Sequence, residues 1–283
     1  MKLTCDYDEG ICRAAIWQRG RMTDLYVDSV LSPDLAGAIV RGRVGRIISG
    51  GKAAWCDIGC VDNVYIESKA PLKSGEIKRL RVDASFSGKK APRAMVLGED
   101  EGPVGILEAP LRPWQRALED HKGKRIECSF TSQDDYDLCA AQYAAEKHIS
   151  FVPLVSNIDE MTTRIDELKD SHVPLSGGGE IVIEQTESLV AIDVNAPQAR
   201  NFLAVNLAAM HEIARHLRLR NLGGIIVIDA LKMSARADKG QVLAALKRAC
   251  ADDPAGATVF DITKLGLIEM TRTRRGRSLM EVL

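Results

Sequence analysis

The chain has 283 residues, of which 46% are hydrophobic, which is enough to bury more than one core. The formal net charge is -1 with 27% charged residues, so the overall charge neither supports nor excludes a nucleic-acid ligand. The first ten residues lack an apolar signal core, and no stretch approaches the roughly 20 apolar residues that a membrane span requires. We therefore expect two or three modules, no membrane span and a cytoplasmic location.

Seven cysteines are scattered along the chain and form no Cys-x-x-Cys pair. They are Cys5, Cys12, Cys56, Cys60, Cys128, Cys139 and Cys250. An odd, dispersed set favours reduced, buried thiols, and structural zinc is the weaker alternative.

The N-terminal residues 13–40 show alternating apolar positions on both sides of Arg19-Gly20, which predicts a β-hairpin. Short β-type runs separated by glycine-containing turns continue from Gly37 to about Val96. Their spacing fits a small five-stranded barrel. Beyond Gly102 the pattern is mixed, and residues 146–176 predict only a weak helix around 158–168.

The C-terminal third has the clearest pattern. Leu189–Asp193 is a short apolar run that ends in an acid, and Ile225–Asp229 is a second one. Between them, apolar residues recur at spacings of three and four from Leu203 to Leu217. Arginines then crowd the last turns before Asn221-Leu222-Gly223-Gly224. These features predict a helix with a cationic C-terminus and a glycine stop.

Strand, helix and strand in this order predict a right-handed crossover with two parallel strands. Asp193 and Asp229 would then lie side by side at the carboxyl ends of the strands, where open α/β sheets bind ligands. Two adjacent carboxylates repel unless one takes a proton or a cation lies between them. Magnesium or manganese, with oxygen ligands, would resolve this conflict. In the alternative interpretation, one acid caps a turn or helix and the other pairs with Arg or Lys.

Three ordered blocks in this region resemble the ribonuclease E/G family. Residues 186–195 (TESLVAIDVN) are similar to its T-E-A-L-x-x-I-D-[IV]-N strand. Residues 212–229 (EIARHLRLRNLGGIIVID) resemble the block E-I-A-R-Q-L-R-L-R-D-L-G-G-L-I-V-I-D. Residues 266–274 (GLIEMTRTR) are similar to F-G-L-L-E-M-[ST]-R-x-R. Upstream, residues 41–47 and 52–59 resemble the barrel motifs [YL]-x-G-R-V-x-R-I and Q-A-A-F-V-D-I-G, with Trp55 in place of the usual Phe.

The resemblance implies a mixed α+β fold. A ribonuclease-H-like subdomain would carry an inserted OB-fold RNA-binding barrel and be followed by a DNase-I-like α/β catalytic subdomain. The expected limits are 1–36 for the N-terminal hairpin, 37–100 for the barrel, 101–188 for the rest of the ribonuclease-H-like subdomain and 189–283 for the catalytic subdomain.

The resemblance also implies a magnesium-dependent endoribonuclease that cuts single-stranded, A/U-rich RNA to 5′-phosphate and 3′-hydroxyl products. Asp193 and Asp229 would hold the metal, and Asn195 would hydrogen-bond a carboxylate or the scissile phosphate. The expected RNA-binding residues are Arg41, Arg43, Arg46, Trp55, Tyr65, Lys264, Arg272 and Arg274. In the alternative interpretation, Trp55 and Tyr65 are core residues of the barrel. The C-terminal arginines, which include Arg275 and Arg277, would then be a solvated charge run.

Several departures from the family pattern qualify this picture. Too few residues lie between the barrel and Ser176 for a complete 5′-monophosphate sensor, so cleavage is expected to be independent of the RNA 5′ end. No C-P-x-C zinc link follows the last block, so no zinc and no zinc-linked tetramer are expected, and the chain would be a monomer or homodimer. Lys232 and Lys264 replace the usual Asp and Arg, and the loop 195–206 is short. A catalytically weak RNA-binding protein on the same scaffold is therefore the alternative function.

Overall fold

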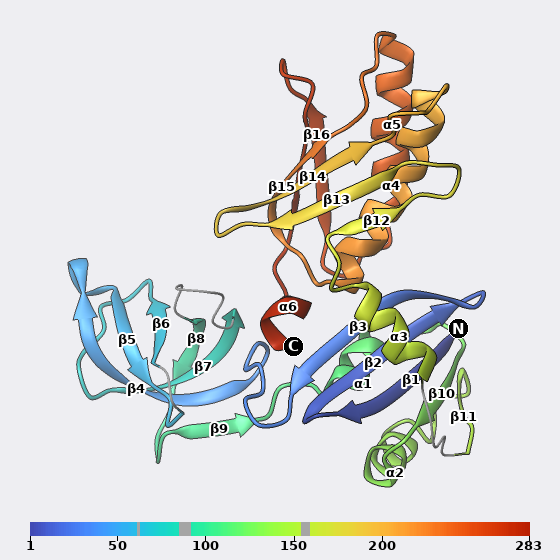
Figure 1. The fold of residues 1–283 in the computed structure, drawn as a ribbon. Helices are drawn as coiled ribbons and strands as arrows, with labels where there is room; N and C mark the ends of the chain where they lie inside the picture. Colours follow the sequence, from blue (N-terminus) through green and yellow to red (C-terminus); the bar gives the residue numbers. More distant parts are fainter. Residues whose placement is uncertain (61–62, 85–91, 154–158) are drawn as a thin grey trace.

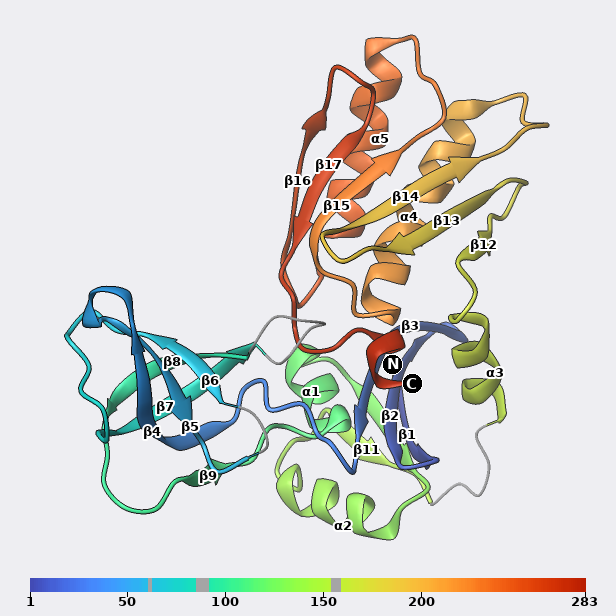
Figure 2. The same cartoon turned by 60° about the vertical axis from the view of Figure 1, so that its left-hand side comes forward.

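The computed structural model describes residues 1–60, 63–84, 92–153 and 159–283, which form three β-sheets (Figure 1). Two sheets carry helices, and the third closes into a barrel that lies to one side of them (Figure 2). The architecture is therefore mixed α+β, as the sequence predicts. Within the described residues, no helix combines the length and the apolar character needed to cross a membrane.

The first sheet has the strand order β11-β10-β1-β2-β3. Its strands are β1 (Lys2–Asp8), β2 (Ile11–Gln18), β3 (Arg21–Ser29), β10 (Ile126–Phe130) and β11 (Ile149–Phe151). β1, β2 and β3 form an antiparallel meander, whereas β10 and β11 join in parallel. The predicted hairpin is confirmed, because Arg19 and Gly20 have φ values of 51° and 74°, the paired positive φ of a two-residue turn.

Three helices belong to the first sheet: α1 (Pro113–Asp120), α2 (Gln133–Gln142) and α3 (Asp159–Glu167). Trp114 of α1 and Cys139 of α2 are fully buried in the core against β1, β2 and β10. Met161 of α3 packs in a separate core with β2 and β3. The weak helix predicted around 158–168 is thus confirmed for its described residues, and residue 158 itself lies outside them.

The barrel is built from five strands, as predicted. They are β4 (Ile39–Ile48), β5 (Ala53–Asp57), β6 (Val64–Glu67), β7 (Ile77–Ala84) and β8 (Arg93–Glu99), with the short helix η1 (Ser49–Gly51) between β4 and β5. The strands pair in the order β5-β6-β8-β7-β4, and β4 pairs again with β5, so the barrel closes in an OB-like manner. Gly42 faces the interior, where a Cβ would lie 2.7 Å from Leu80 Cδ1, so a larger residue there would displace the Leu80 side chain.

The C-terminal sheet has the strand order β12-β13-β14-β15-β17-β16. Its strands are β12 (His172–Pro174), β13 (Glu180–Gln185), β14 (Leu189–Asn195), β15 (Gly224–Asp229), β16 (Ala257–Ile262) and β17 (Ile268–Arg272). Only β14 and β15 are parallel, and the other neighbours are antiparallel. Helices α4 (Phe202–Leu219) and α5 (Arg236–Ala249) cover one face and leave the other open (Figures 1 and 2).

Helix α4 connects the two parallel strands, as the apolar periodicity predicts. The Asn201 side chain caps its start by accepting a hydrogen bond from the backbone N–H of Ala204 at 3.1 Å. Arg218 supplies a cation in the last turn, as expected. The left-handed residue after the helix is Asn221, with φ 47°, and not a glycine. Asn tolerates this conformation, and its amide donates to the carbonyls of Arg275 and Arg277 at 2.7 and 2.8 Å.

Two of the expected domain limits lie inside sheets. Because β12 and β13 pair with β14, the C-terminal sheet begins at His172, before the limit expected at residue 189. β9 (Gly105–Glu108) pairs with β4, so the barrel sheet extends beyond residue 100. β9 and β12 are too short, at four and three residues, for sequence to assign them to a sheet, whereas the apolar run of β13 at 181–183 was overlooked.

Charged side chains join the C-terminal sheet unit to the first sheet. Arg275 makes a bidentate pair with Asp120 on α1 at 2.7 and 2.9 Å. Arg277 contacts Asp28 on β3 at 3.0 Å, and Arg218 of α4 pairs with Asp24 on the same strand at 3.0 Å. Helix α6 (Leu279–Val282) then packs Leu279 into the core of β3 and α3. The three pairs Arg275–Asp120, Arg277–Asp28 and Arg218–Asp24 are called the inter-sheet contact below.

Candidate functional site

Asp193 and Asp229 lie directly opposite each other on β14 and β15, with their Cα atoms in register. Both strands are parallel and end in this region, so the acids share the carboxyl edge that the sequence predicts. The preceding residues, Ile192 and Ile228, are 2% and 0% exposed beneath α4 and α5. Strand alternation therefore turns both carboxylates to the open face, where they are exposed.

Asn195 lies two residues after Asp193 on the same face. Its amide nitrogen Nδ2 donates a hydrogen bond to Asp193 Oδ2 at 2.8 Å. The bond uses one carboxylate oxygen and fixes the rotation of the group, while the other oxygen stays available to a ligand.

An open pocket of about 320 Å³ surrounds the two acids. Its lining residues are Val182, Glu184, Ala191, Ile192, Asp193, Val227, Asp229 and Leu267. Glu184 is a third carboxylate that the sequence interpretation missed, although its alternation with buried Ile181 and Ile183 would have placed it on the open face. Carboxylate and amide oxygens are the donors that magnesium and manganese prefer, so this set fits such a cation.

The alternative structural roles of the two acids find no support. Among the described residues, no Lys or Arg forms an ion pair with Asp193 or Asp229. Neither acid caps a helix, because α4 begins after Asn201 and α5 after Ala235.

Lys232 and Lys264 are exposed and are not part of the pocket lining. Lys232 lies in the loop after β15, and Lys264 lies in the turn between β16 and β17 beside Leu265, which is 87% exposed. Both lie outside the pocket that surrounds the carboxylates.

The predicted role of Arg272 in RNA binding is wrong. Its side chain is only 5% exposed and makes a bidentate pair with buried Asp253, at 2.7 and 3.0 Å. Its third nitrogen donates to the carbonyl of Leu222 at 2.8 Å. The guanidinium therefore stabilises the protein interior and is not accessible to a phosphate.

The other C-terminal arginines also differ from a mobile basic tail and from a solvated charge run. Arg275 and Arg277 belong to the inter-sheet contact. Arg274 is partly buried and packs over Gly223 and Gly224. A Cβ added at Gly223 would lie 3.0 Å from the Cα and 3.1 Å from the Cγ of Arg274, and one added at Gly224 would lie 2.9 Å from its Nε. Its assignment to RNA stays a prediction.

Trp55 and Tyr65 are on the outer surface of the barrel, so the alternative that they form its core is wrong. They are cross-strand partners on β5 and β6, half-buried, with ring centroids 5.7 Å apart in an edge-to-face arrangement. The neighbouring core positions are Ala54, Cys56, Val64 and Ile66. Tyr65 donates its hydroxyl to Glu67 at 2.9 Å, and this hydrogen bond raises the pKa of Tyr65.

Arg93 extends this pair and was missed by the sequence interpretation. It is the β8 neighbour of Tyr65, and its guanidinium carbon lies 5.6 Å from the tyrosine ring centroid. The contact depends on the parallel pairing of β6 with β8, which local sequence does not reveal. Arg46 flanks the other end, at a bulge of β4 opposite β5. Trp55, Tyr65, Arg93 and Arg46 thus make a row across the barrel, called the barrel strip below.

The three predicted barrel arginines differ in their contacts. Arg41 forms an ion pair with Asp100 at 3.2 Å and donates to the carbonyl of Pro103 at 3.3 Å, so it fastens the loop before β9. Arg43 and Arg46 are exposed and form no ion pair within the described part of the chain. They are therefore the better candidates for contacts with a phosphate.

Comparison with known proteins agrees with the motifs. A model of the ribonuclease E/G family matches residues 110–275. A "Ribonuclease E/G-like protein, chloroplastic" from Arabidopsis thaliana is 40% identical over 147 residues, which are 49% of this chain and 14% of that protein. Ribonuclease E of Escherichia coli is 39% identical over 137 residues, or 46% of this chain and 13% of that protein.

Ribonuclease G of Haemophilus influenzae is 32% identical over 228 residues. That segment is 73% of this chain and 45% of the relative. The chain therefore spans less than half the length of each of these curated relatives.

Proposed function

The chain belongs to the ribonuclease E/G family, and from this premise we propose that it is a metal-dependent endoribonuclease acting on single-stranded RNA. The observation that carries the proposal is the pair Asp193 and Asp229, in register on parallel strands, exposed in one pocket and without a cationic partner among the described residues. A catalytic metal site of oxygen donors has this form.

In the proposed mechanism, Asp193 and Asp229 hold magnesium, for which manganese can substitute. When bound, the cation supplies a nucleophilic water at neutral pH and offsets negative charge on the phosphorus centre. Asn195 keeps Asp193 in the orientation that presents its second oxygen, and the second N–H of its amide would remain able to donate to a phosphate of the RNA backbone. Attack by water, and not by the ribose 2′-hydroxyl, would leave 5′-phosphate and 3′-hydroxyl ends.

The barrel strip is proposed to hold the single strand. Half-buried aromatic rings on an outer barrel surface can stack on any base, with about 1 to 3 kcal/mol per base. Arg43 and Arg46 would add contacts with phosphates that carry no sequence information. A/U-rich substrates fit a surface of this kind, because they are the sequences that most readily remain single-stranded.

The sheet units are proposed to correspond to the family's ribonuclease-H-like and DNase-I-like subdomains, with the latter starting at His172. The cytoplasmic location and the monomeric or homodimeric state stay predictions.

Cleavage is proposed to be independent of the RNA 5′ end. Between Gly102 and Ser176, the described residues contribute β9–β11 and α1–α3, which complete the barrel and the first sheet, and β12, which starts the C-terminal sheet. One oligonucleotide with a 5′-hydroxyl, 5′-monophosphate or 5′-triphosphate should be cut at equal rates within about two-fold. A ten-fold preference for monophosphate, ~1.4 kcal/mol in the transition state, would contradict this proposal.

The test of the function is cleavage of a 5′-blocked A/U-rich oligonucleotide by the purified chain, with magnesium and with a chelator. We expect products bearing 5′-phosphates with magnesium only, and none from Asp193→Asn. RNA binding without cleavage under saturating magnesium would favour the catalytically weak RNA-binding protein. Products with a 2′,3′-cyclic phosphate would contradict the proposed chemistry.

A further inference from the structure

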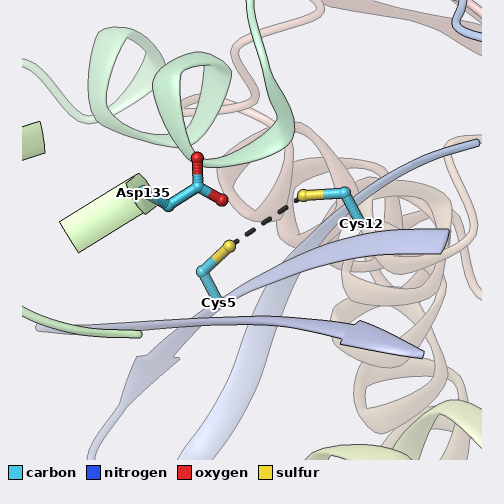
Figure 3. A group of neighbouring side chains, drawn as sticks. All are labelled: Cys5, Cys12 and Asp135. Carbon is cyan, nitrogen blue, oxygen red and sulfur yellow. Dashed lines mark hydrogen bonds between the residues drawn. The ribbon is translucent and has the colours of Figure 1, made fainter. Parts of the chain in front are cut away.

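Two cysteines and an aspartate meet in the core of the first sheet. Cys5 lies on β1, Cys12 on β2 and Asp135 in the first turn of α2 (Figure 3). The two Sγ atoms are 4.0 Å apart, and one ligand atom from each of the three residues lies within 4.8 Å of the others. The residues are 1%, 4% and 0% exposed.

The spacing of the sulfurs matches ligands of a shared cation. Two thiolates at ~2.3 Å from a tetrahedral zinc ion lie about 3.8 Å apart, so the observed separation needs to change by only a few tenths of an ångström. A disulfide, by contrast, requires an S–S distance of about 2.05 Å, so the sulfurs would have to approach each other by about 2 Å. The observed separation therefore lies much closer to that of two ligands of one ion than to that of a disulfide.

The charges of the neighbouring groups also leave room for a divalent cation. Asp135 forms an ion pair with Arg112 through Oδ1, so its negative charge is already balanced. Two thiolates would balance the two charges of the ion, and the whole group would be neutral in the buried site. The second oxygen, Oδ2, accepts a hydrogen bond from Tyr7 at 2.6 Å. In Figure 3, one carboxylate oxygen points towards the two sulfurs.

A cation can reach this group through a single layer of side chains. Tyr7 is 40% exposed, and the Arg112 side chain is 49% exposed, although both contact the buried Asp135. Rotation of the Tyr7 ring would expose the carboxylate and make a fourth ligand position available to its hydroxyl or to water.

We propose that Cys5, Cys12 and Asp135 form a site for a thiophilic divalent cation, zinc in the first place, which joins β1, β2 and α2. Each thiol transfers its proton to solvent as its sulfur–metal bond forms, so two protons leave for each ion bound. The site is separate from the Asp193 pocket and does not rest on the proposed nuclease activity. It departs from the expectation of no zinc and takes up structural zinc, the weaker alternative that the sequence left for the cysteines.

The test titrates the chelator-treated, reduced full chain with Co²⁺ under anaerobic conditions. A Cys60→Ser background removes the cysteine whose side chain is exposed. One equivalent of Co²⁺ should produce a sulfur-to-cobalt charge-transfer band in the near ultraviolet, and one equivalent of Zn²⁺ should remove it.

Matched variants locate the band. Cys5→Ser and Cys12→Ser should abolish it, and Asp135→Asn should weaken Co²⁺ binding at least ten-fold. Cys139→Ser, the same substitution at another buried thiol of this core, should retain the band. Asp193→Asn should also retain it, since that site offers oxygen ligands only.

If the serine variants at Cys5 and Cys12 fail to fold, a measurement on the chain that keeps both cysteines still tests the proposal. X-ray absorption of the zinc-loaded Cys60→Ser chain should show two sulfur ligands at about 2.3 Å with the remainder oxygen. Absence of the cobalt band from the folded protein, or zinc bound by oxygen and nitrogen alone, would overturn the site.

Discussion

Charged residues are used in opposite ways at the inter-sheet contact and at the open face of the C-terminal sheet. At the contact, Asp28 and Asp120 are each paired with an arginine, and Asp253 pairs with Arg272 in the core behind it. At the open face, Asp193 and Asp229 lie side by side with no cationic side chain paired to either, as far as the described residues extend.

This difference separates structural from functional charge. A buried carboxylate must be paired because desolvation would otherwise strongly destabilise the fold. Two carboxylates on neighbouring strands repel each other, and the single hydrogen bond from Asn195 to Asp193 brings no positive charge, so their placement points to a cation that arrives from solvent. The same contrast divides the arginines, with Arg272 and Arg275 paired and Arg43 and Arg46 free of ion pairs in the described structure.

The largest expected effect is loss of cleavage on neutralising either exposed acid. Asp193→Asn or Asp229→Asn should lower the rate at least about a thousand-fold, or ~4 kcal/mol, while RNA affinity stays within a few-fold and the free energy of unfolding does not fall. Single-turnover cleavage, filter binding and urea unfolding of each variant measure the three quantities. Parental cleavage rates under saturating magnesium would show that the two-aspartate mechanism is wrong.

At the buried pair of Arg272 and Asp253, the expected effect of substitution is a loss of stability. Arg272→Met leaves Asp253 buried without a partner and should lower the free energy of unfolding by about 3 kcal/mol. Urea unfolding is the measurement, and Lys264→Met, a change at an exposed cation, is the control and should have little effect. Equal midpoints for the two variants would mean that the Arg272 pair has no structural role.

The barrel surface offers a smaller test, which separates stacking on Trp55 from the phosphate contact proposed for Arg43. Trp55→Ala should weaken binding of single-stranded RNA by about 2 kcal/mol with little sequence dependence. Arg43→Ala should instead reduce the dependence of log K on log salt by about one unit. Binding isotherms at several salt concentrations measure both effects. An early melting transition of Trp55→Ala would indicate that the ring supports the barrel and would count against stacking.

The smallest effect concerns His216, which lies between Arg215 and Arg220 beneath the inter-sheet contact. Burial, with a smaller contribution from these arginines, lowers the pKa of His216 to about 2. Below the unfolded pKa of about 6.5, the unfolded chain binds a proton that the folded chain does not, so stability falls as the pH falls.

Between pH 7 and 5.5 the parent should lose about 1 kcal/mol more than His216→Gln, as measured by urea unfolding at each pH. Parallel losses in the two proteins would show that this histidine titrates normally in the fold.

The sequence predicted the parts of the molecule whose local pattern is strong. The apolar runs before Asp193 and Asp229, with α4 between them, specify a parallel strand pair, and the edge position of the acids follows from that topology alone. Helix α2 was missed because only Asp135 and Cys139 are buried along it, so it shows no apolar period.

Contacts between residues far apart in the sequence could not be predicted from local patterns. The segment 271–277 (TRTRRGR) has the composition of a basic tail, and its arginines are structural only because Asp253, Asp120 and Asp28 meet them in the folded chain. Arg93 likewise gains its role from a strand pairing that skips β7.

The inter-sheet contact also bears on the order in which the protein is assembled during synthesis. Arg277 meets Asp28 across a sequence separation of 249 residues, and Arg275 meets Asp120 across 155. The ribosome makes the N-terminal strands first, so β3 and α1 emerge long before their arginine partners exist. Until then, Asp28 and Asp120 have only their partners within the N-terminal unit, among them Arg116 and Tyr26, and a transient binding partner such as a chaperone would find this surface open. Pausing translation before Arg275 should therefore prolong the lifetime of an intermediate in which the first sheet is folded and the pairs of Arg275 and Arg277 have not yet formed.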